Sequence, residues 1–182
     1  MSRPAPEPAE VAARVAALLR EVPDYPEPGV LFRDITPVLA DAAAFADLVA
    51  VLAAGAPDGV DLVAGMESRG FLLAAPIAVA LRAGLVPVRK AGKLPGPTLS
   101  ETYDLEYGTA TLEIHPFTVP AGSRVLVVDD VLATGGTAAA TLKLIADCGA
   151  TVVGVTVLAE LVGLGGRARL PGVLVEALLT LP

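Results

Sequence analysis

Residues 125–137 read VLVVDDVLATGGT, and this stretch constrains the fold of the chain more than any other. Four apolar residues precede two adjacent carboxylates, and three further residues lead into a turn that contains two glycines. A short apolar run bounded by turn residues predicts a buried strand, and the glycine turn precedes a helical pattern. Packing alone does not require two acidic residues at the tip of a buried strand. The stretch therefore predicts a strand–turn–helix unit that binds a ligand where the strand ends.

Strand and helix patterns alternate along most of the chain. Residues 23–37 carry four prolines and one glycine, so we expect a long ordered loop or a short irregular strand there. Elsewhere the apolar periodicity predicts helices over residues 9–22, 41–53, 70–83 and 136–148, with Asp41 as a cap, and strands over residues 61–66, 85–89, 109–115, 125–129, 151–158 and 173–179. Buried strands separated by helices predict an α/β fold, with a mostly parallel sheet that helices cover on both faces.

Size, charge and cysteine content narrow the classes of protein to consider. The 182 residues suit one compact domain. A net charge of −7 argues against a nucleic-acid partner and against an anionic membrane surface. We find no signal peptide pattern and no convincing membrane span. The single cysteine, Cys148, excludes an internal disulfide framework and fits a reducing compartment, so we expect a cytoplasmic protein.

The ligand expected at residues 125–137 is a sugar phosphate. In open α/β sheets, ligands bind beyond the carboxyl ends of the strands, where the sequence places Asp129 and Asp130. A carboxylate only accepts hydrogen bonds, so it suits a sugar diol or a metal ion. Gly135 and Gly136 let backbone amides converge at a helix N-terminus, which favours an anion.

Other glycine-rich motifs fit this stretch less well. No lysine follows the turn as a Walker A loop requires, and the dinucleotide fingerprint G-x-G-x-x-G is missing. The alternative without a ligand is a helix that Thr134 caps after an acidic turn. The strand and the acidic pair ahead of the turn favour the phosphate site.

VLVVDDVLATGGT resembles the motif that binds 5-phosphoribosyl 1-pyrophosphate (PRPP) in type I phosphoribosyltransferases. Three further segments narrow the resemblance to the adenine phosphoribosyltransferases: YPEPGVLFRDITP (25–37), ESRGF (67–71) and VRKAGKLPGPTLSETYDLEYGTATLEIH (88–115). The resemblance runs from about residue 23 to residue 161, in the same order and with similar spacing. It implies a Rossmann-like, type I phosphoribosyltransferase fold in a single domain over residues 1–182. Within that domain we expect an N-terminal helix and base-binding hood over residues 1–37, a core over 38–161 and a C-terminal tail over 162–182.

The resemblance also implies a reaction, which is transfer of the 5-phosphoribosyl group from PRPP to adenine in purine salvage, with AMP and pyrophosphate as products. In the family the acidic pair holds the ribose hydroxyls, the following loop binds the 5-phosphate, and basic residues face the pyrophosphate. The implied PRPP-binding residues are Asp129, Asp130, Ala133, Thr134, Gly135, Gly136, Thr137, Arg69, Arg89, Lys90 and Lys93. Mg²⁺ is expected to bind with PRPP, held mainly by substrate oxygens and water rather than by side chains.

Residues 99–108 (LSETYDLEYG) form a polar insertion with the marks of a flexible lid loop, and an exposed surface hairpin is the alternative. By resemblance the catalytic residues are Glu106, which would shuttle a proton near the purine N7, Arg69, and Tyr107, which would lie near the sugar. The implied adenine-binding residues are Leu31, Phe32, Arg33, Ala133 and Leu158. A homodimer is expected from the resemblance alone.

Two other functions stay open at this point. One is a phosphoribosyltransferase for another nucleobase, such as a 6-oxopurine or orotate, although those relatives lack a hood like Phe32-Arg33-Asp34. The other is a regulator that senses PRPP and binds nucleic acid, which should carry a basic face or an added DNA-binding segment. The sequence favours the adenine enzyme over both.

Overall fold

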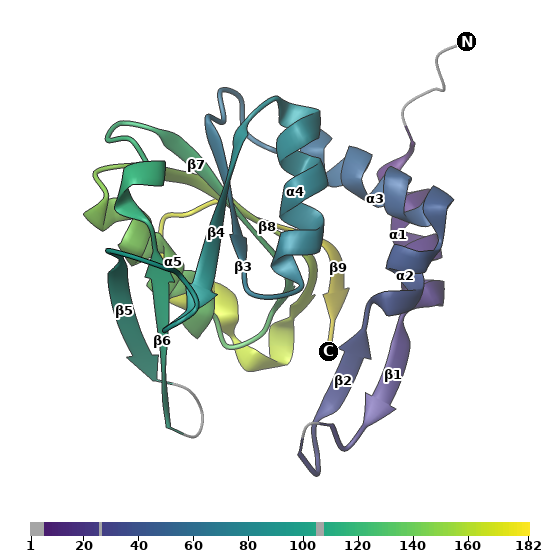
Figure 1. Ribbon diagram of the computed structural model, residues 1–182. Coiled ribbons are helices and arrows are strands. Elements are labelled where there is room, and N and C mark those ends of the chain that lie inside the picture. Colours follow the sequence, from purple (N-terminus) through teal and green to yellow (C-terminus); the bar gives the residue numbers. More distant parts are fainter. Residues whose placement is uncertain (1–5, 26, 105–107) are drawn as a thin grey trace. The chain divides into compact units, whose positions relative to one another are not determined.

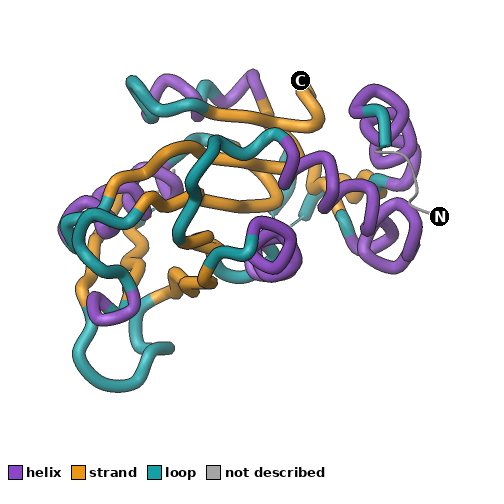
Figure 2. The backbone as a smooth tube through the Cα atoms, turned by 90° about the horizontal axis from the view of Figure 1, so that it is seen from above, coloured by secondary structure: helices purple, strands orange, loops and turns teal. Residues whose placement is uncertain are grey.

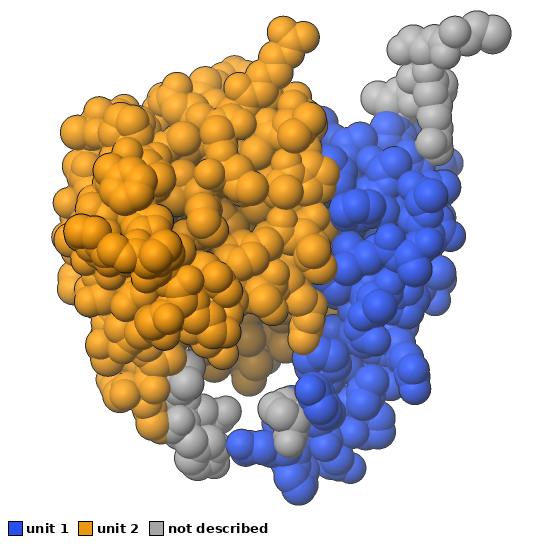
Figure 3. All heavy atoms as spheres, viewed as in Figure 1, with its two compact units in different colours: residues 1–54 blue, residues 55–182 orange. Residues whose placement is uncertain are grey.

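The computed structural model describes residues 6–25, 27–104 and 108–182. The chain divides into two compact units, residues 1–54 and residues 55–182 (Figure 3). Among the described residues, no helix has the length and apolar character needed to span a membrane.

In the described part of the first unit, three helices accompany a two-stranded antiparallel ribbon. Its elements are α1 (Pro8–Leu18), β1 (Arg20–Pro23), β2 (Leu31–Asp34), α2 (Thr36–Ala40) and α3 (Ala42–Ala54) (Figure 1). The Asp41 carboxylate accepts hydrogen bonds from the amides of Ala43 at 3.0 Å and Ala44 at 2.8 Å, which confirms the predicted cap. The predicted irregular strand within residues 23–37 is β2, which pairs with β1.

The helix predicted over residues 9–22 is too long. It ends at Leu18, and residues 20–23 form β1 instead, with Val22 opposite Phe32 of β2. Pro23 disfavours helical backbone at the residue before it, so the apolar spacing of Val22 does not keep it in the helix. Pairing with β2 then fixes the extended conformation.

The second unit is built on a seven-stranded sheet in the order β5-β6-β4-β3-β7-β8-β9. The five strands from β4 to β9 in that order run parallel, and β6 and β5 are antiparallel to their neighbours. The predicted α/β fold with a mostly parallel sheet is therefore confirmed, as is the C-terminal strand. The elements are β3 (Leu62–Met66), α4 (Gly70–Leu81), β4 (Gly84–Lys90), β5 (Leu99–Asp104), β6 (Thr109–Ile114), β7 (Arg124–Leu132), α5 (Gly136–Asp147), β8 (Thr151–Leu161) and β9 (Val175–Leu181), with 3₁₀ turns at Pro116–Thr118, Val162–Leu164 and Gly166–Arg169.

Helices α4 and α5 cover opposite faces of this sheet (Figures 1 and 2). On the α5 face, Met66 and Val127 belong to one apolar cluster with Leu144 of the helix. On the α4 face, Gly65 allows close packing, because a Cβ at this position would lie 2.7 Å from the Cβ of Ala74. Side chains of alternate strand residues thus enter two separate apolar layers.

Three further strands differ from the sequence prediction. β8 was expected to end at residue 158 but continues to Leu161, which still pairs with Leu181 of β9. β7 was expected to end at residue 129 but continues to Leu132, because Val131 and Leu132 still pair with β8. The predicted lid loop over residues 99–108 begins with a regular strand, β5, whose six residues all pair with β6. Glu101 faces the same side of β5 as Leu99 and Tyr103, so its charge hides the two-residue period in the sequence.

Candidate active site

Asp129 and Asp130 lie inside β7 but beyond the end of its neighbour β3. The β3–β7 pairing stops at Val128, whereas the β7–β8 pairing continues through Leu132. Among the described residues, the edge of β7 that faces β3 therefore has no strand partner at the two carboxylates. A cavity of about 260 Å³ opens there, which we call the diacid cavity. Its lining residues are Glu67, Ser68, Arg69, Lys90, Asp129, Asp130 and Thr137.

An arginine from the neighbouring loop pairs with the second carboxylate. The Arg69 guanidinium donates a hydrogen bond to Asp130 Oδ2 at 2.8 Å, and Asp130 is only 8% exposed. Gly70 makes this approach possible, because a Cβ there would lie 2.8 Å from both Asp129 Oδ1 and the Val128 carbonyl oxygen. The start of α4 therefore contacts β7 directly and brings a cation to the acidic pair.

The first carboxylate is less acidic than an ordinary aspartate. Burial raises the pKa of Asp129 well above its usual range, and the negative charge of Asp130 raises this pKa further. A hydrogen bond from the Asp130 amide to Asp129 Oδ1 at 2.9 Å offsets part of the shift. A ligand that donates hydrogen bonds to Asp129 would favour its ionised form.

Glu67 forms hydrogen bonds with the basic residues at and just after the end of β4. Its carboxylate accepts hydrogen bonds from Lys93 Nζ at 2.7 Å, the Lys90 amide at 2.8 Å and Arg89 Nε at 3.4 Å. Burial alone would raise the pKa of Glu67, but the contacts with Lys93, Lys90 and Arg89 outweigh it and lower the pKa. Glu67 thus stays ionised and holds the segment from Arg89 to Lys93 beside the diacid cavity.

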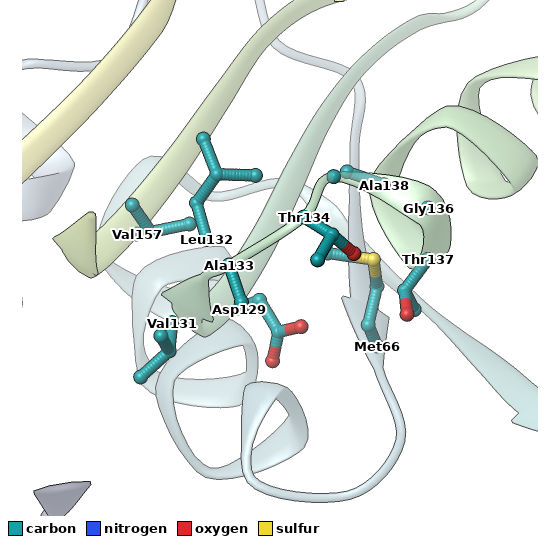
Figure 4. A pocket seen from close by; sticks show the side chains of 11 residues that line it. Met66, Asp129, Val131, Leu132, Ala133, Thr134, Gly136, Thr137, Ala138 and Val157 are labelled. Atoms are coloured by element: carbon teal, nitrogen blue, oxygen red, sulfur yellow. The ribbon is translucent and has the colours of Figure 1, made fainter. Parts of the chain in front are cut away.

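The glycine turn after β7 encloses a second, smaller cavity of about 70 Å³, which we call the turn cavity (Figure 4). Asp129 and Thr137 line both cavities, so the two are adjacent. The other residues lining the turn cavity are Met66, Val131, Leu132, Ala133, Thr134, Gly135, Gly136, Ala138 and Val157. The first amides of α5 have no acceptor within their own helix, so this turn can bind an anion.

Close backbone contact holds the turn in place. Gly135 has a φ of +80°, and a Cβ on it would lie 2.4 Å from the Gly166 carbonyl oxygen. A Cβ on Gly166 would in turn lie 2.2 Å from the Ala133 carbonyl oxygen. Two glycines thus let the 3₁₀ turn Gly166–Arg169 lie directly behind the glycine turn.

An ion pair between the exposed Arg167 and the buried Glu160 anchors that supporting segment. Arg167 donates to both carboxylate oxygens of Glu160, with its Nε at 3.1 Å and 3.2 Å from them. A further guanidinium nitrogen of Arg167 donates to the Val175 carbonyl oxygen at 2.7 Å. The hydrogen bond from Arg167 lowers the pKa of Glu160, which is 5% exposed, so the pair is ionised at neutral pH. It ties the turn beside Gly166 to the ends of β8 and β9.

Comparisons with known proteins agree on one family. Residues 37–168 match the family model described as the phosphoribosyl transferase domain. The adenine phosphoribosyltransferase of Streptomyces coelicolor is 57% identical over 179 residues, covering 96% of this chain and 98% of the relative. The chain belongs to the adenine phosphoribosyltransferase family. This family transfers the 5-phosphoribosyl group of PRPP to adenine.

Solved structures of adenine phosphoribosyltransferases share the fold. The enzyme from Rhodothermus marinus matches with a TM-score of 0.91 and 48% identity, covering 95% of this chain and 99% of that chain. The enzyme from Saccharomyces cerevisiae, solved with an imino-altritol bisphosphate and adenine, matches with a TM-score of 0.88 and 39% identity, covering 93% of this chain and 99% of that one. The predicted type I phosphoribosyltransferase fold is thereby confirmed.

Most of the predicted PRPP-binding residues of this member of the adenine phosphoribosyltransferase family lie close together in the structure. Arg69, Lys90, Asp129, Asp130 and the five residues from Ala133 to Thr137 all line one of the two adjacent cavities. Arg89 and Lys93 do not line either cavity, but both donate hydrogen bonds to Glu67, which lines the diacid cavity. Their predicted roles in binding remain proposals.

The predicted adenine-binding residues come from both units. Leu31, Phe32 and Arg33 lie on β2 of the first unit, where the Phe32 ring packs against Tyr25 with centroids 5.0 Å apart and Arg33 forms an ion pair with Glu21. Ala133 lines the turn cavity, and the Leu158 side chain is buried in β8. The predicted catalytic residues Glu106 and Tyr107 lie outside the described residues.

The sequence prediction assigned no role to three residues that support the site, although Glu67 lies in the quoted segment ESRGF. Glu67 accepts hydrogen bonds from the basic residues beside the diacid cavity. Gly166 and Arg167 support the glycine turn, and both belong to the segment predicted to be a C-terminal tail. For Glu67 the available signal was a charged residue directly after a buried strand. For Gly166 no local signal exists, because its partners lie more than thirty positions earlier in the sequence.

Proposed function

We propose that this chain transfers the 5-phosphoribosyl group of PRPP to adenine, forming AMP and pyrophosphate in purine salvage, and that the two adjacent cavities bind PRPP. The main structural support for this proposal is that Asp129 and Thr137 line both cavities. A phosphate in the turn cavity would therefore lie beside carboxylates that can accept hydrogen bonds from a pentose diol. Membership in the adenine phosphoribosyltransferase family supports this assignment.

The pyrophosphate end of PRPP would face the basic side of the diacid cavity. Arg69 and Lys90 line this cavity, and Glu67 holds Arg89 and Lys93 next to it. Among residues 6–25, 27–104 and 108–182, no carboxylate forms an ion pair with the Lys90 ammonium. Within this part of the chain, Lys90 therefore has no ion-pair partner to give up when it binds an anion.

Mg²⁺ fits the donors of the diacid cavity. The carboxylates of Glu67, Asp129 and Asp130 are oxygen ligands of the kind this ion prefers, but Lys93 and Arg69 already engage two of them. Within the described part of the chain, no cluster of three metal-ligating side chains forms a cage. PRPP oxygens and water would hold the ion, with Asp129 and Asp130 accepting hydrogen bonds from its waters. When bound, Mg²⁺ would neutralise charge on the pyrophosphate.

The proposed chemistry breaks the bond between the sugar C1 and the pyrophosphate and forms a bond from C1 to adenine N9. The sugar acquires oxocarbenium-like charge as the leaving group departs, as in glycoside cleavage. Arg69 and Lys90 would stabilise the departing anion, while Asp129 and Asp130 hold the ribose. As N9 bonds to C1, Glu106 would take up the proton that adenine loses from N7, and it would return this proton in the reverse reaction. Tyr107 would pack near the sugar. Leu31, Phe32, Arg33, Ala133 and Leu158 would bind the base.

A screen of nucleobases tests the proposed function. We supply the purified chain with PRPP and Mg²⁺ and with adenine, hypoxanthine, guanine or orotate in turn, and we detect nucleotide by chromatography. AMP should form rapidly with adenine, and the other bases should react at least about 100-fold more slowly. Preferred use of another base would replace the proposal by the first alternative. PRPP binding without nucleotide formation from any base would favour a regulator.

Asp130→Asn should weaken PRPP binding by about ten-fold, because an amide replaces a charged acceptor of the ribose hydroxyls. Titration calorimetry with PRPP and Mg²⁺ measures the dissociation constant. Asp147→Asn provides the control, since Asp147 is an exposed residue at the far end of α5. Equal affinity of the Asp130 variant and the parent would exclude the proposed contact with ribose.

PRPP binding should release protons from Asp129. Burial and the neighbouring charge of Asp130 raise the pKa of Asp129 in the free site, which favours its protonated form. Hydroxyl groups that donate to the carboxylate lower this pKa, so binding expels the proton and PRPP affinity increases as the pH rises. Calorimetry at saturating PRPP in two buffers of different ionisation enthalpy measures the release. Asp129→Asn removes only the contribution of this carboxyl, so an identical release in both proteins would contradict the role of Asp129.

We also propose a cytoplasmic homodimer. The apolar side chains Leu72 and Val79 on α4 are 49% and 79% exposed, and Leu85 on β4 is 46% exposed. Exposed apolar residues of this size commonly pack at protein interfaces. Light scattering should give twice the chain mass of 18.4 kDa, and cell fractionation should recover the protein with cytoplasmic markers. A monomeric mass or recovery with membranes would contradict the respective part.

A further inference from the structure

Tyr103 contacts the glycine turn with both its ring and its hydroxyl. The Tyr103 hydroxyl lies 3.0 Å from Thr137 Oγ1, within hydrogen-bonding distance. Its ring lies against Gly136, where a Cβ would be 3.1 Å from ring atom Cδ2 and 3.3 Å from Cε2. Tyr103 belongs to β5, more than thirty residues before the turn in the sequence. The turn is therefore in contact with a strand that was expected to be a loop.

The fold fixes Tyr103 in this position. The antiparallel pairing of β5 with β6 places Tyr103 opposite Ala110. Alternation along β5 puts Glu101 on the same side of the strand as Tyr103, and Glu101 accepts a hydrogen bond from Lys143 of α5 at 2.5 Å. β5 and α5 pack together (Figure 1), and two side chains of β5 contact the start and the middle of α5.

Thr137 occupies the point where the two cavities meet, since it lines both of them. A threonine hydroxyl carries one hydrogen and can also accept hydrogen bonds. If Thr137 donates its hydrogen to a phosphate oxygen, it can bind Tyr103 only as an acceptor. An anion in the turn cavity therefore sets the direction of the contact, with Tyr103 as the donor to Thr137.

We infer that Tyr103 is a positioning residue for the 5-phosphate of PRPP and AMP. Its hydroxyl donates to Thr137, and the Thr137 hydroxyl donates to a phosphate oxygen. Successive hydrogen bonds of this kind polarise one another, so the Tyr103 contact strengthens the Thr137 contact with the anion. The inference rests on the proposed function, because it assigns the turn cavity to the phosphate.

Tyr103→Phe tests this inference, because it removes the hydroxyl and keeps the ring that packs on Gly136. The KM for PRPP and the inhibition constant of AMP should both rise about five-fold, the effect expected for one hydrogen bond. The KM for adenine, the inhibition constant of pyrophosphate and kcat should change by less than about two-fold, because none of them depends on the 5-phosphate contact. A merely structural defect would shift all of these constants together.

A double-mutant cycle with Thr137→Val isolates the pair. Thr137→Val already removes the acceptor, so adding Tyr103→Phe to it should raise the KM for PRPP by less than about two-fold further. Thr137→Ser retains a hydroxyl and should retain the full five-fold effect of Tyr103→Phe. Independent effects in the cycle would overturn the inference.

The neighbouring residue offers a matched control. The Thr102 hydroxyl lies 2.9 Å from that of Thr111 on β6, so Thr102→Val removes a hydroxyl contact of the same strand away from the turn. This variant should leave the KM for PRPP unchanged. If Thr102→Val and Tyr103→Phe have equal effects, the integrity of the hairpin is responsible and the inference fails. If the unmodified chain forms no AMP from PRPP and adenine, the proposed function fails first.

Discussion

Gly135→Val is expected to abolish saturation of the enzyme with PRPP within the accessible concentration range. Gly135 has a φ of +80°, and its Cβ position lies 2.4 Å from the Gly166 carbonyl oxygen. A β-branched residue must distort this turn, at a cost on the order of 1–3 kcal/mol for the backbone conformation alone. The amides that would bind the phosphate move with it, so we expect the KM for PRPP to rise by about 100-fold or more. Steady-state kinetics at fixed adenine measures the change.

Gly172→Val separates this effect from the general cost of a left-handed conformation. Gly172 also has a positive φ, +76°, but among the described residues no heavy atom beyond its own chain neighbours lies within 4 Å of its Cβ position. Both variants should lose thermal stability, and only the Gly135 variant should lose affinity for PRPP. If the Gly135 variant saturates with PRPP as the parent does, the phosphate does not bind at this turn.

Glu106→Gln should lower kcat by about 100-fold, while the KM for PRPP changes by less than about two-fold. Glutamine keeps the size of the side chain and its hydrogen-bonding capacity but cannot take up a proton. The assignment of Glu106 rests on the family resemblance. Rapid-quench measurement of AMP formation in a single turnover reports the chemical step directly.

Glu101→Gln is the matched control for that experiment. Glu101 lies on the strand that leads toward Glu106 and binds Lys143 on the protein surface. It should retain nearly the full rate of the chemical step, since exposed ion pairs contribute little. A normal rate in Glu106→Gln would remove its role in proton transfer.

Local patterns predicted the secondary structure where the physical cause was itself local. The apolar period located β3, α4, β4 and α5 to within two residues, and the Asp41 cap could be inferred from its position. The predictions failed where a distant partner decides the conformation. β1 exists because it pairs with β2, β7 extends because β8 continues beside it, and β5 forms because β6 supplies its hydrogen bonds.

The residues of the candidate site also fall into two groups, those that the local sequence predicts and those that distant contacts bring in. Asp129, Asp130 and the glycine turn lie close together in the sequence, so their shared chemistry could be predicted from one stretch of thirteen residues. Glu67, Tyr103 and Gly166 reach the same place from other strands and turns. Their contribution depends on the strand order and on contacts of a few ångströms, which a single sequence does not specify.

In the free protein, Arg69 and Asp130 neutralise each other. If pyrophosphate draws the guanidinium away, the carboxylate needs a new hydrogen-bond donor, and a ribose diol can supply it. Pyrophosphate bound by itself would leave the Asp130 carboxylate without a hydrogen-bond donor from the ligand. Ribose phosphate bound by itself would compete with Arg69 for this carboxylate. This exchange of partners favours binding of a molecule that carries both a pyrophosphate and a ribose diol. An acidic protein can therefore bind the highly charged PRPP more tightly than pyrophosphate or ribose phosphate alone.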